Sequence, residues 1–419
     1  MTGERIKHVA LAAGFLTAIF SVAAAQVGIE LGRGERLRIA GLFRKAPTEA
    51  NLRALEKQLD DACWFSGQLR PWVQYAQFLV LGDCGERAVM GRDGWFFYKP
   101  EVQYLIEPWK RGRESFSAKG ERPGGKAPEK DSRPLSPDDA IPAIVSFGDQ
   151  LAARGIALLV VPAPNKASVY PEMLVARVGA EGGRGGSEGG RGKAKRCPRH
   201  TQELLAQLEA AGVEAVDLFA VFEQAKAERP QDAARAFYLA QDTHWSPEGV
   251  QLAAHAVAQK VLGLNWVSRG AVRYDLRPIA VRRHGDILEM MQVPQIERHF
   301  PPEEITCRQV ILYRDDPESP VLVLGDSFLR IYQQDEPRSA GFIAHLAREL
   351  RQPVASLVND GGGSTLVRQD LSRKPALLAG KKLVIWEFVE RDIRFGTEGW
   401  QEVPLPDNSS GTYEAESGK

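Results

Sequence analysis

The chain has 419 residues, of which 43% are hydrophobic, and its 54 basic side chains balance 54 acidic ones. This length corresponds to two or three domains, and the apolar content is sufficient for a sizeable core. A net charge of zero argues against a dedicated nucleic-acid binder, because such proteins carry a basic excess. The long polar stretches exclude a protein that crosses a membrane many times.

The N-terminus carries the signals of an exported protein. Residues 9–25 contain no charge and follow Arg5 and Lys7. Ala23–Ala25 form a small-residue site of the kind at which signal peptides are cleaved. The uncharged residues that follow make the segment long enough for a signal anchor. We therefore predict that residues 1–30 direct the chain to the periplasm, and both a cleaved form and a form anchored in the inner membrane remain open.

The four cysteines are Cys63, Cys84, Cys197 and Cys307. None lies in a CxxC pair or beside a histidine at zinc-binding spacing, so no metal site is predicted. An even number of cysteines in an exported chain predicts up to two disulfides. The short separation favours a Cys63–Cys84 bridge, which leaves Cys197 and Cys307 for the second, although the sequence does not decide the pairing.

Residues 85–400 alternate between aliphatic strands and helices, which predicts an α/β domain with a mostly parallel sheet covered on both faces. Strands are expected at residues 156–161, 213–216, 237–239, 321–324, 354–357 and 383–388. A glycine-rich basic stretch over 177–196 is expected to be a flexible insert. Residues 31–84 are expected to be an irregular lead-in with a helix near 49–63, and residues 401–419 a polar tail.

The first segment with chemical potential is Gly-Asp-Ser at residues 325–327, directly after an apolar strand. Functional groups of parallel sheets lie at the carboxyl ends of the strands. Gly325 permits a tight turn there, and the loop can expose the hydroxyl of Ser327 as a nucleophile. The motif alone is also compatible with an ordinary strand-end turn, in which Asp326 makes a local hydrogen bond.

The second segment is Asp242-Thr243-His244-Trp245-Ser246-Pro247. A nucleophilic serine needs a base, usually a histidine, and the base needs a carboxylate that orients it. In an extended backbone, residues two apart point to the same side. Asp242 can therefore orient His244, and His244 can take the proton of Ser327. A histidine bonded locally to its neighbouring aspartate is the structural alternative.

Together, the segments DTHWSPEGV and VLVLGDSF resemble the SGNH-hydrolase-like domain of the AlgJ and AlgX alginate O-acetyltransferase family. Further matching segments are GRDGWFFY at 91–98, VPAPNKASVYPE at 161–172, HGDILEM at 284–290 and VIWEFVERDI at 384–393. The resemblance covers roughly residues 80–396, and the aspartate and histidine precede the serine, as in this family and unlike ordinary SGNH esterases. The glycine-rich insert departs from the family, and the carbohydrate-binding module of AlgX is expected to be absent.

The resemblance implies a flavodoxin-like three-layer α/β sandwich with a Ser-His-Asp triad and no cofactor. It implies periplasmic transfer of acetyl groups to the hydroxyls of an exopolysaccharide, alginate or a similar polymer, through an acetyl-serine intermediate. The implied partners are a membrane-bound O-acyltransferase that supplies acetyl groups and an accessory periplasmic protein. Two other functions remain open: a polysaccharide acetylesterase, because the same triad can serve water, and a non-catalytic polysaccharide-binding scaffold.

Other residues are weaker candidates for the site. The oxyanion of an acyl-transfer intermediate needs backbone N–H donors, and those of Ser327, Gly361 and Gly362 are candidates because residues 359–364 follow a strand. Lys166, Tyr332 and Arg391 lie at the edges of predicted strands or motifs, where they can reach a substrate. The basic members suit an anionic uronate, although a structural salt bridge is the alternative for each.

Overall fold

The computed structural model describes residues 3–106 except 45 and 47, together with residues 139–174, 198–229 and 237–406. It divides into two compact units. The first comprises Met1–Gly85 and Gln292–His299, and the second comprises Glu86–Met291 and Phe300–Lys419. The expected insert at 177–196 and most of the expected tail lie outside the described residues.

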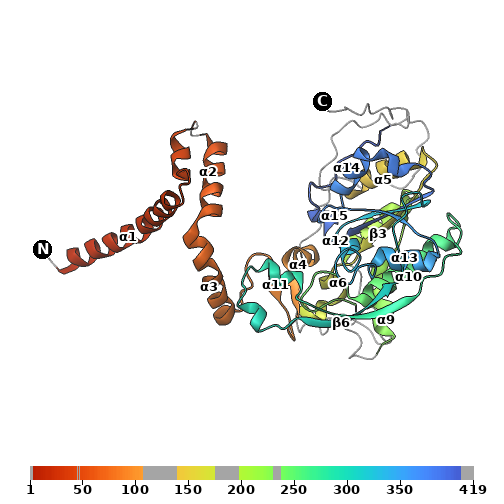
Figure 1. Ribbon diagram of the computed structural model, residues 1–419, viewed down its shortest axis with the longest axis horizontal. Helices are drawn as coiled ribbons and strands as arrows, with labels where there is room; N and C mark the ends of the chain where they lie inside the picture. The colour runs from red at the N-terminus through yellow and green to blue at the C-terminus, as the bar shows by residue number, and fades with distance from the viewer. Residues whose placement is uncertain are drawn as a thin grey trace, which may run out of the picture. The chain divides into compact units, whose positions relative to one another are not determined.

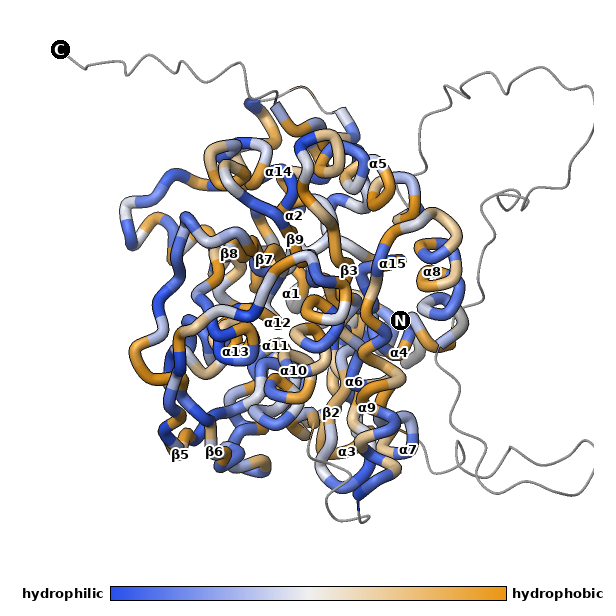
Figure 2. The backbone as a smooth tube through the Cα atoms, turned by 90° about the vertical axis from the view of Figure 1, so that its right-hand side faces the viewer, coloured by the Kyte–Doolittle hydropathy of each residue, from blue (hydrophilic) through white to orange (hydrophobic). Residues whose placement is uncertain are grey.

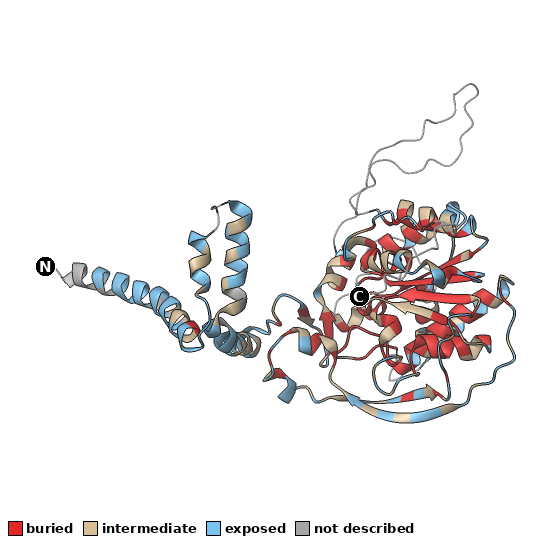
Figure 3. Ribbon diagram, turned by 45° about the horizontal axis from the view of Figure 1, so that its top comes forward, coloured by how far each residue is buried: buried red, intermediate tan, exposed pale blue. Residues whose placement is uncertain are grey.

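The first unit is helical rather than irregular. It contains α1 (Gly3–Gly32), the 3₁₀ helix η1 (Arg38–Phe43), α2 (Glu49–Ala62), α3 (Trp64–Leu81) and the short η3 (Ile296–Arg298). The helix expected near 49–63 is confirmed as α2, whereas α3 was not expected. Within α1, residues Leu11–Gly32 are long and apolar enough to cross a membrane. Figure 3 shows that these helices are mostly exposed.

The predicted Cys63–Cys84 disulfide is wrong. Cys63 precedes α3 and Cys84 follows it, and an 18-residue helix holds its ends about 27 Å apart. Disulfide formation requires Cα atoms within about 7 Å. No disulfide joins Cys63, Cys84 and Cys307, the cysteines within the described part of the chain. Cys197, the expected partner of Cys307, lies outside it.

The second unit is built on a parallel sheet that has five strands within the described residues, in the order β4-β3-β9-β7-β8. These strands are β3 (Ala157–Ala163), β4 (Glu214–Ala215), β7 (Val321–Gly325), β8 (Ala355–Val358) and β9 (Leu383–Val389). They match five of the predicted strands. Apart from Glu387 of β9, the three central strands are mostly hydrophobic (Figure 2), because both of their faces are covered.

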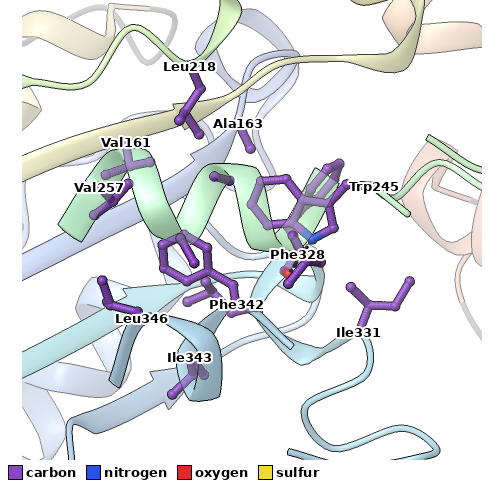
Figure 4. Close-up of a cluster of buried hydrophobic side chains, with 14 of the residues drawn as sticks. Val161, Ala163, Leu218, Trp245, Val257, Phe328, Ile331, Phe342, Ile343 and Leu346 are labelled. Atoms are coloured by element: carbon purple, nitrogen blue, oxygen red, sulfur yellow. Dashed lines mark hydrogen bonds between the residues drawn. The ribbon is translucent and has the colours of Figure 1, made fainter. Parts of the chain in front are cut away.

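Helices cover both faces of this sheet. Side chains that alternate along a strand point to opposite faces, and Val321 and Val323 accordingly join one core cluster while Leu322 and Leu324 join the other. One face carries α6 (Lys166–Val169), α9 (Leu218–Ala227), α10 (Pro247–Gly263) and α13 (Phe342–Leu350) (Figures 1 and 4). The other carries α5 (Ala140–Ala152), α8 (Arg199–Ala210) and α14 (Leu366–Arg373). The expected three-layer α/β sandwich is therefore confirmed.

The remaining helices are short and flank the sheet. They are α4 (Lys99–Ile106), α7 (Pro171–Leu174), α11 (Asp286–Met290), α12 (Ser327–Arg330), η4 (Pro375–Leu378) and α15 (Asp392–Phe395). The first residues of the expected polar tail are not a free tail, because Val403 and Leu405 are buried. The Leu405 N–H donates to Gln150 of α5 at 2.6 Å.

Two antiparallel pairs lie outside the main sheet. β1 (Ala88–Met90) pairs with β2 (Phe96–Tyr98) on either side of the Gly-Arg-Asp-Gly segment at 91–94. β5 (Leu276–Arg283) pairs with β6 (Glu303–Val310) over eight residues, and its last pair joins Arg283 to Glu303. We call β5 and β6 the ribbon. It was not predicted, and the strand expected at 237–239 is reduced to a single bridge between Tyr238 and Trp245.

Candidate active site

Ser327 lies at the carboxyl end of β7, where the chain turns sharply into α12. Asp326 caps the short helix, because its Oδ1 accepts a hydrogen bond from the Phe328 N–H at 2.9 Å. A Cβ atom on Gly325 would lie 2.3 Å from Oε2 of Glu387, so only glycine fits beneath this turn. The turn leaves Ser327 partly exposed while Asp326 and Phe328 are buried.

The Asp242–His244 segment enters α10, whose first turn is capped by Ser246. Trp245 follows the histidine and is fully buried. Its indole N–H donates to the carbonyl oxygen of Phe328 at 3.1 Å, and the Trp245 and Phe328 rings meet edge to face (Figure 4). This contact fixes the histidine segment against the serine turn.

The serine, histidine and aspartate form a continuous hydrogen-bonded chain. Nε2 of His244 lies 2.8 Å from Oγ of Ser327, and Nδ1 lies 2.7 Å from Oδ1 of Asp242. The same Oδ1 accepts from the His244 backbone N–H at 3.0 Å. The three side chains therefore meet as expected, although His244 and Ser327 are 83 residues apart in the sequence.

The electrostatics of the chain favour an ionised aspartate beside a basic imidazole. Burial raises the pKa of Asp242, but its contacts with His244 and Arg283 outweigh this and hold it well below its usual value. Burial lowers the pKa of His244, but the Asp242 carboxylate outweighs it, so the net shift is upward. A raised pKa makes the imidazole a stronger proton acceptor.

Comparison with known proteins identifies the domain. The model of the family described as the SGNH hydrolase-like domain of the acetyltransferase AlgX matches residues 125–390, more than half of the chain. The chain belongs to this family. The expected family assignment and fold class are therefore confirmed.

Curated relatives of this AlgX-type domain are named probable alginate O-acetylase AlgJ. The one from Pseudomonas fluorescens is 25% identical over 269 residues, covering 59% of this chain and 60% of the relative. The one from Pseudomonas aeruginosa is 23% identical and covers 74% and 71%. The chain thus spans about 60% of the length of the first of these relatives.

A solved structure supports the same fold. The O-acetyltransferase domain of Pseudomonas putida AlgJ is 23% identical, with a TM-score of 0.51, and the match covers 74% of this chain and 92% of that domain. At this identity the likeness concerns the fold.

Two residues that sequence reasoning missed hold Asp242 of the AlgX-type domain: Arg283 ends β5 of the ribbon, and Asp286 follows it closely. The Arg283 guanidinium donates to Oδ2 of Asp242 at 2.9 Å. The Asp286 backbone N–H approaches the same oxygen at 3.4 Å, and its carboxylate accepts from the Thr243 N–H at 2.7 Å. Both oxygens of Asp242 are thus engaged. The only sequence signal was the matching HGDILEM segment, which begins directly after Arg283.

Opposite charges on either side hold the backbone of the same segment. On one side, the Glu303 carboxylate accepts from the backbone N–H groups of Ala240 and Gln241 at 3.0 and 2.8 Å. On the other, the buried Lys166 ammonium donates to three backbone carbonyls. The segment is also crowded from outside, because a Cβ atom on Gly285 would lie 1.9 Å from the Gln241 carbonyl oxygen.

The three weaker substrate candidates lie in structural positions. Lys166 and Tyr332 are fully buried, so the expectation that they contact substrate is not met. Tyr332 donates to the Trp245 carbonyl at 3.4 Å and therefore supports the histidine segment, as Lys166 does. Arg391 forms an ion pair with buried Glu101 at 3.1 Å and lies over the ring of Tyr98. The salt-bridge alternative thus describes Arg391.

The candidate oxyanion donors differ in their availability. The Gly362 N–H donates to the Asn359 carbonyl at 3.0 Å, so it is committed to a turn and does not fit the expected role. Gly361 sits in that turn with a φ of +67°. Gly363 lies closer to the serine turn, because a Cβ atom on it would lie 2.8 Å from Oδ2 of Asp326. For the Ser327 N–H, no described residue serves as a hydrogen-bond acceptor.

Asp242, His244 and Asp286 present oxygen and nitrogen atoms within 4.8 Å of one another, a spacing also found in metal sites. Here the Arg283 guanidinium already supplies the positive charge beside Asp242. Asp286 is further engaged by the Thr243 hydroxyl, which donates to it at 2.5 Å. Hydrogen bonding to the histidine segment accounts for the arrangement.

Proposed function

We propose that this chain is an O-acetyltransferase that acetylates hydroxyl groups of an exopolysaccharide, alginate or a similar uronate polymer. The observation that carries the proposal is the hydrogen-bonded chain from Ser327 through His244 to Asp242. Membership of the AlgX-type family and the names of the AlgJ relatives support acetyl transfer to alginate as the reaction. A polymer needs an open site, and Ser327 is partly exposed at the carboxyl end of β7.

In the first half of the reaction, Ser327 takes the acetyl group. Nε2 of His244 removes the hydroxyl proton as Oγ forms a bond to the acetyl carbonyl carbon. Asp242 stabilises the imidazolium that results. The negative oxygen of the tetrahedral intermediate is held by the Ser327 N–H and by a second donor, for which the backbone at Gly363 is best placed. Collapse breaks the bond to the donor's leaving group, which receives the proton from His244.

In the second half, a sugar hydroxyl replaces the leaving group. His244, neutral again, removes the proton of that hydroxyl as its oxygen attacks the acetyl-Ser327 carbonyl. The intermediate then collapses, the bond between Oγ and the acetyl carbon breaks, and Oγ recovers its proton from the imidazolium. The product is an acetylated sugar and regenerated enzyme, and no cofactor takes part.

The acetyl donor and the location follow from the same proposal. α1 provides a signal or an anchor that supports a periplasmic location. Because acetyl-CoA is a cytoplasmic donor, a membrane-bound O-acyltransferase is the proposed source of acetyl groups, with an accessory periplasmic protein as a further partner.

A partition experiment tests the proposal. The purified chain is mixed with a chromogenic acetyl ester and an oligouronate, and acetylated sugar and free acetate are quantified by mass spectrometry. We expect acetylated sugar to form and the peptide containing Ser327 to carry a transient acetyl group. Acetate release at a rate that does not change with the concentration of the sugar would instead identify an esterase. Sugar binding without either product would identify a scaffold.

Replacing Asp286 with asparagine is expected to move the acid limb of the pH–rate profile to lower pH. Activity requires the neutral imidazole, which exists above the pKa of His244, and the Asp286 carboxylate is one of the charges that raise that pKa. Burial and then Asp242 raise the pKa of Asp286 itself to about 6, so it is ionised at neutral pH. A profile of kcat/KM against pH measures the shift, and an unmoved limb with a lower plateau would show that Asp286 acts only on the structure.

A further inference from the structure

One side of α3 is an exposed apolar stripe. Its members recur at intervals of three and four residues, which places them on one face of a helix. They are Phe65, Leu69, Trp72, Val73, Ala76, Leu79 and Val80. Exposure of the large side chains ranges from 43% for Phe65 to 80% for Val80. A contiguous apolar surface of this kind marks an interaction site rather than ordinary surface.

The rest of α3 differs in character. Its less exposed residues include Tyr75, whose hydroxyl lies 2.7 Å from Nε2 of His299 within the same unit. The other positions carry the polar residues Ser66, Gln68, Arg70, Gln74 and Gln77, of which only Arg70 is charged, together with Trp64, Gly67, Pro71, Phe78 and Leu81. The preceding helix α2, by contrast, carries exposed charged side chains at Glu49, Arg53, Glu56 and Lys57. Apolar and charged surfaces are therefore carried by different helices.

Contacts with α1 indicate what covers the stripe. Gln26 of α1 donates to the Ala62 carbonyl at 3.1 Å and accepts from the Trp64 N–H at 2.9 Å. The start of α3 is thus attached to the later part of the apolar segment Leu11–Gly32. Gln26 lies about 22 Å along the helix from Leu11, close to one boundary of a hydrocarbon core about 30 Å thick.

The composition of α3 suits that depth. Tryptophan and tyrosine concentrate at membrane–water boundaries, and α3 carries Trp64, Trp72 and Tyr75. A helix with an apolar stripe lies in the plane of the interface, with the stripe among the acyl chains, when polar side chains occupy much of its remaining surface, as Gln68, Arg70, Gln74 and Gln77 do here. We propose that α3 is an interfacial helix whose stripe is buried in the outer boundary of the same bilayer that α1 crosses. This inference is independent of the acetyl-transfer chemistry.

Lipid-borne quenching tests the proposal on the full-length chain. The chain is reconstituted in vesicles of phosphatidylethanolamine and phosphatidylglycerol, with ordinary or brominated acyl chains, in a Trp64→Phe background. Bromine quenches only tryptophans within the acyl region. We expect the emission contributed by Trp72, obtained by difference from a further Trp72→Phe variant, to lose most of its intensity in brominated vesicles.

A matched control moves the reporter to the other side of the same helix. Gly67 is exposed on the face of α3 opposite the stripe, and nothing lies within 4 Å of a Cβ atom added there. In the variant Trp64→Phe, Trp72→Phe, Gly67→Trp, the added emission is expected to resist brominated lipid and to be quenched by aqueous acrylamide. The proposal is overturned if Trp72 itself is reached by acrylamide and spared by brominated lipid, because the stripe would then face water. It is equally overturned if Trp72 is shielded from both quenchers, because a membrane protein partner or a second copy would then cover the stripe.

Discussion

Replacing Ser327 with alanine is expected to lower kcat for acetyl transfer by about 10⁴-fold or more, because the acyl-enzyme can no longer form. The hydroxyl is the only part of the site removed, and His244 keeps its bond to Asp242. Binding of the oligouronate should remain, since the serine is proposed to act on the acetyl group rather than to hold the polymer. Steady-state transfer from a chromogenic acetyl ester and a separate binding titration measure the two effects.

The control for this variant is Ser372→Ala at the end of α14, where the hydroxyl donates only to the Pro404 carbonyl. It should leave the transfer rate close to that of the unmodified chain. Transfer by Ser327→Ala at the unmodified rate would refute the proposed covalent route, even if the enzyme class were right. Loss of polymer binding together with transfer would point to misfolding, which a thermal melt distinguishes.

The sequence predicted the central sheet and the serine–histidine pair because their signals are local. Continuous aliphatic runs such as Val321–Leu324 are typical of buried parallel strands, and the Gly-Asp-Ser motif lies where that strand ends. The contact between Asp242 and His244 is likewise local, because the two residues are two positions apart in the sequence. What joined the motifs to each other was the family resemblance, since periodicity does not state which strand ends are neighbours.

Other features depend on contacts that no local pattern encodes. The ribbon alternates partly buried and exposed side chains, but a proline in β5 and the charged residues of both strands obscure that alternation in the sequence. Arg283 and Glu303 reach the histidine segment only because the ribbon pairs them. Lys166 was a candidate ligand for an anionic sugar, but its ammonium group is buried and donates to three backbone carbonyls. The disulfide prediction failed because α3 was not recognised. The distance that this helix places between Cys63 and Cys84 was therefore not considered.

Replacing Asp242 with asparagine is expected to lower kcat by about 10⁴-fold while leaving the fold largely intact. An amide of the same size can donate to the Nδ1 position of His244, which then holds the imidazole in the wrong tautomer, with its proton on Nε2 facing Ser327. The variant also removes the carboxylate that raises the pKa of His244. The acid limb of the residual activity should therefore move to lower pH.

The matched control for Asp242→Asn is Asp149→Asn, an exposed aspartate on α5 that covers the other face of the sheet. A second comparison uses Arg283→Met, which leaves Asp242 in place but removes the charge that holds its Oδ2. If Asp242 acts by orienting His244, Arg283→Met should reduce kcat by a smaller factor than Asp242→Asn and leave KM for the sugar unchanged. Equal losses of kcat and of thermal stability in all the Asp242 and Arg283 variants would mean that the ion pair maintains the fold and that the aspartate has no separate part in proton transfer.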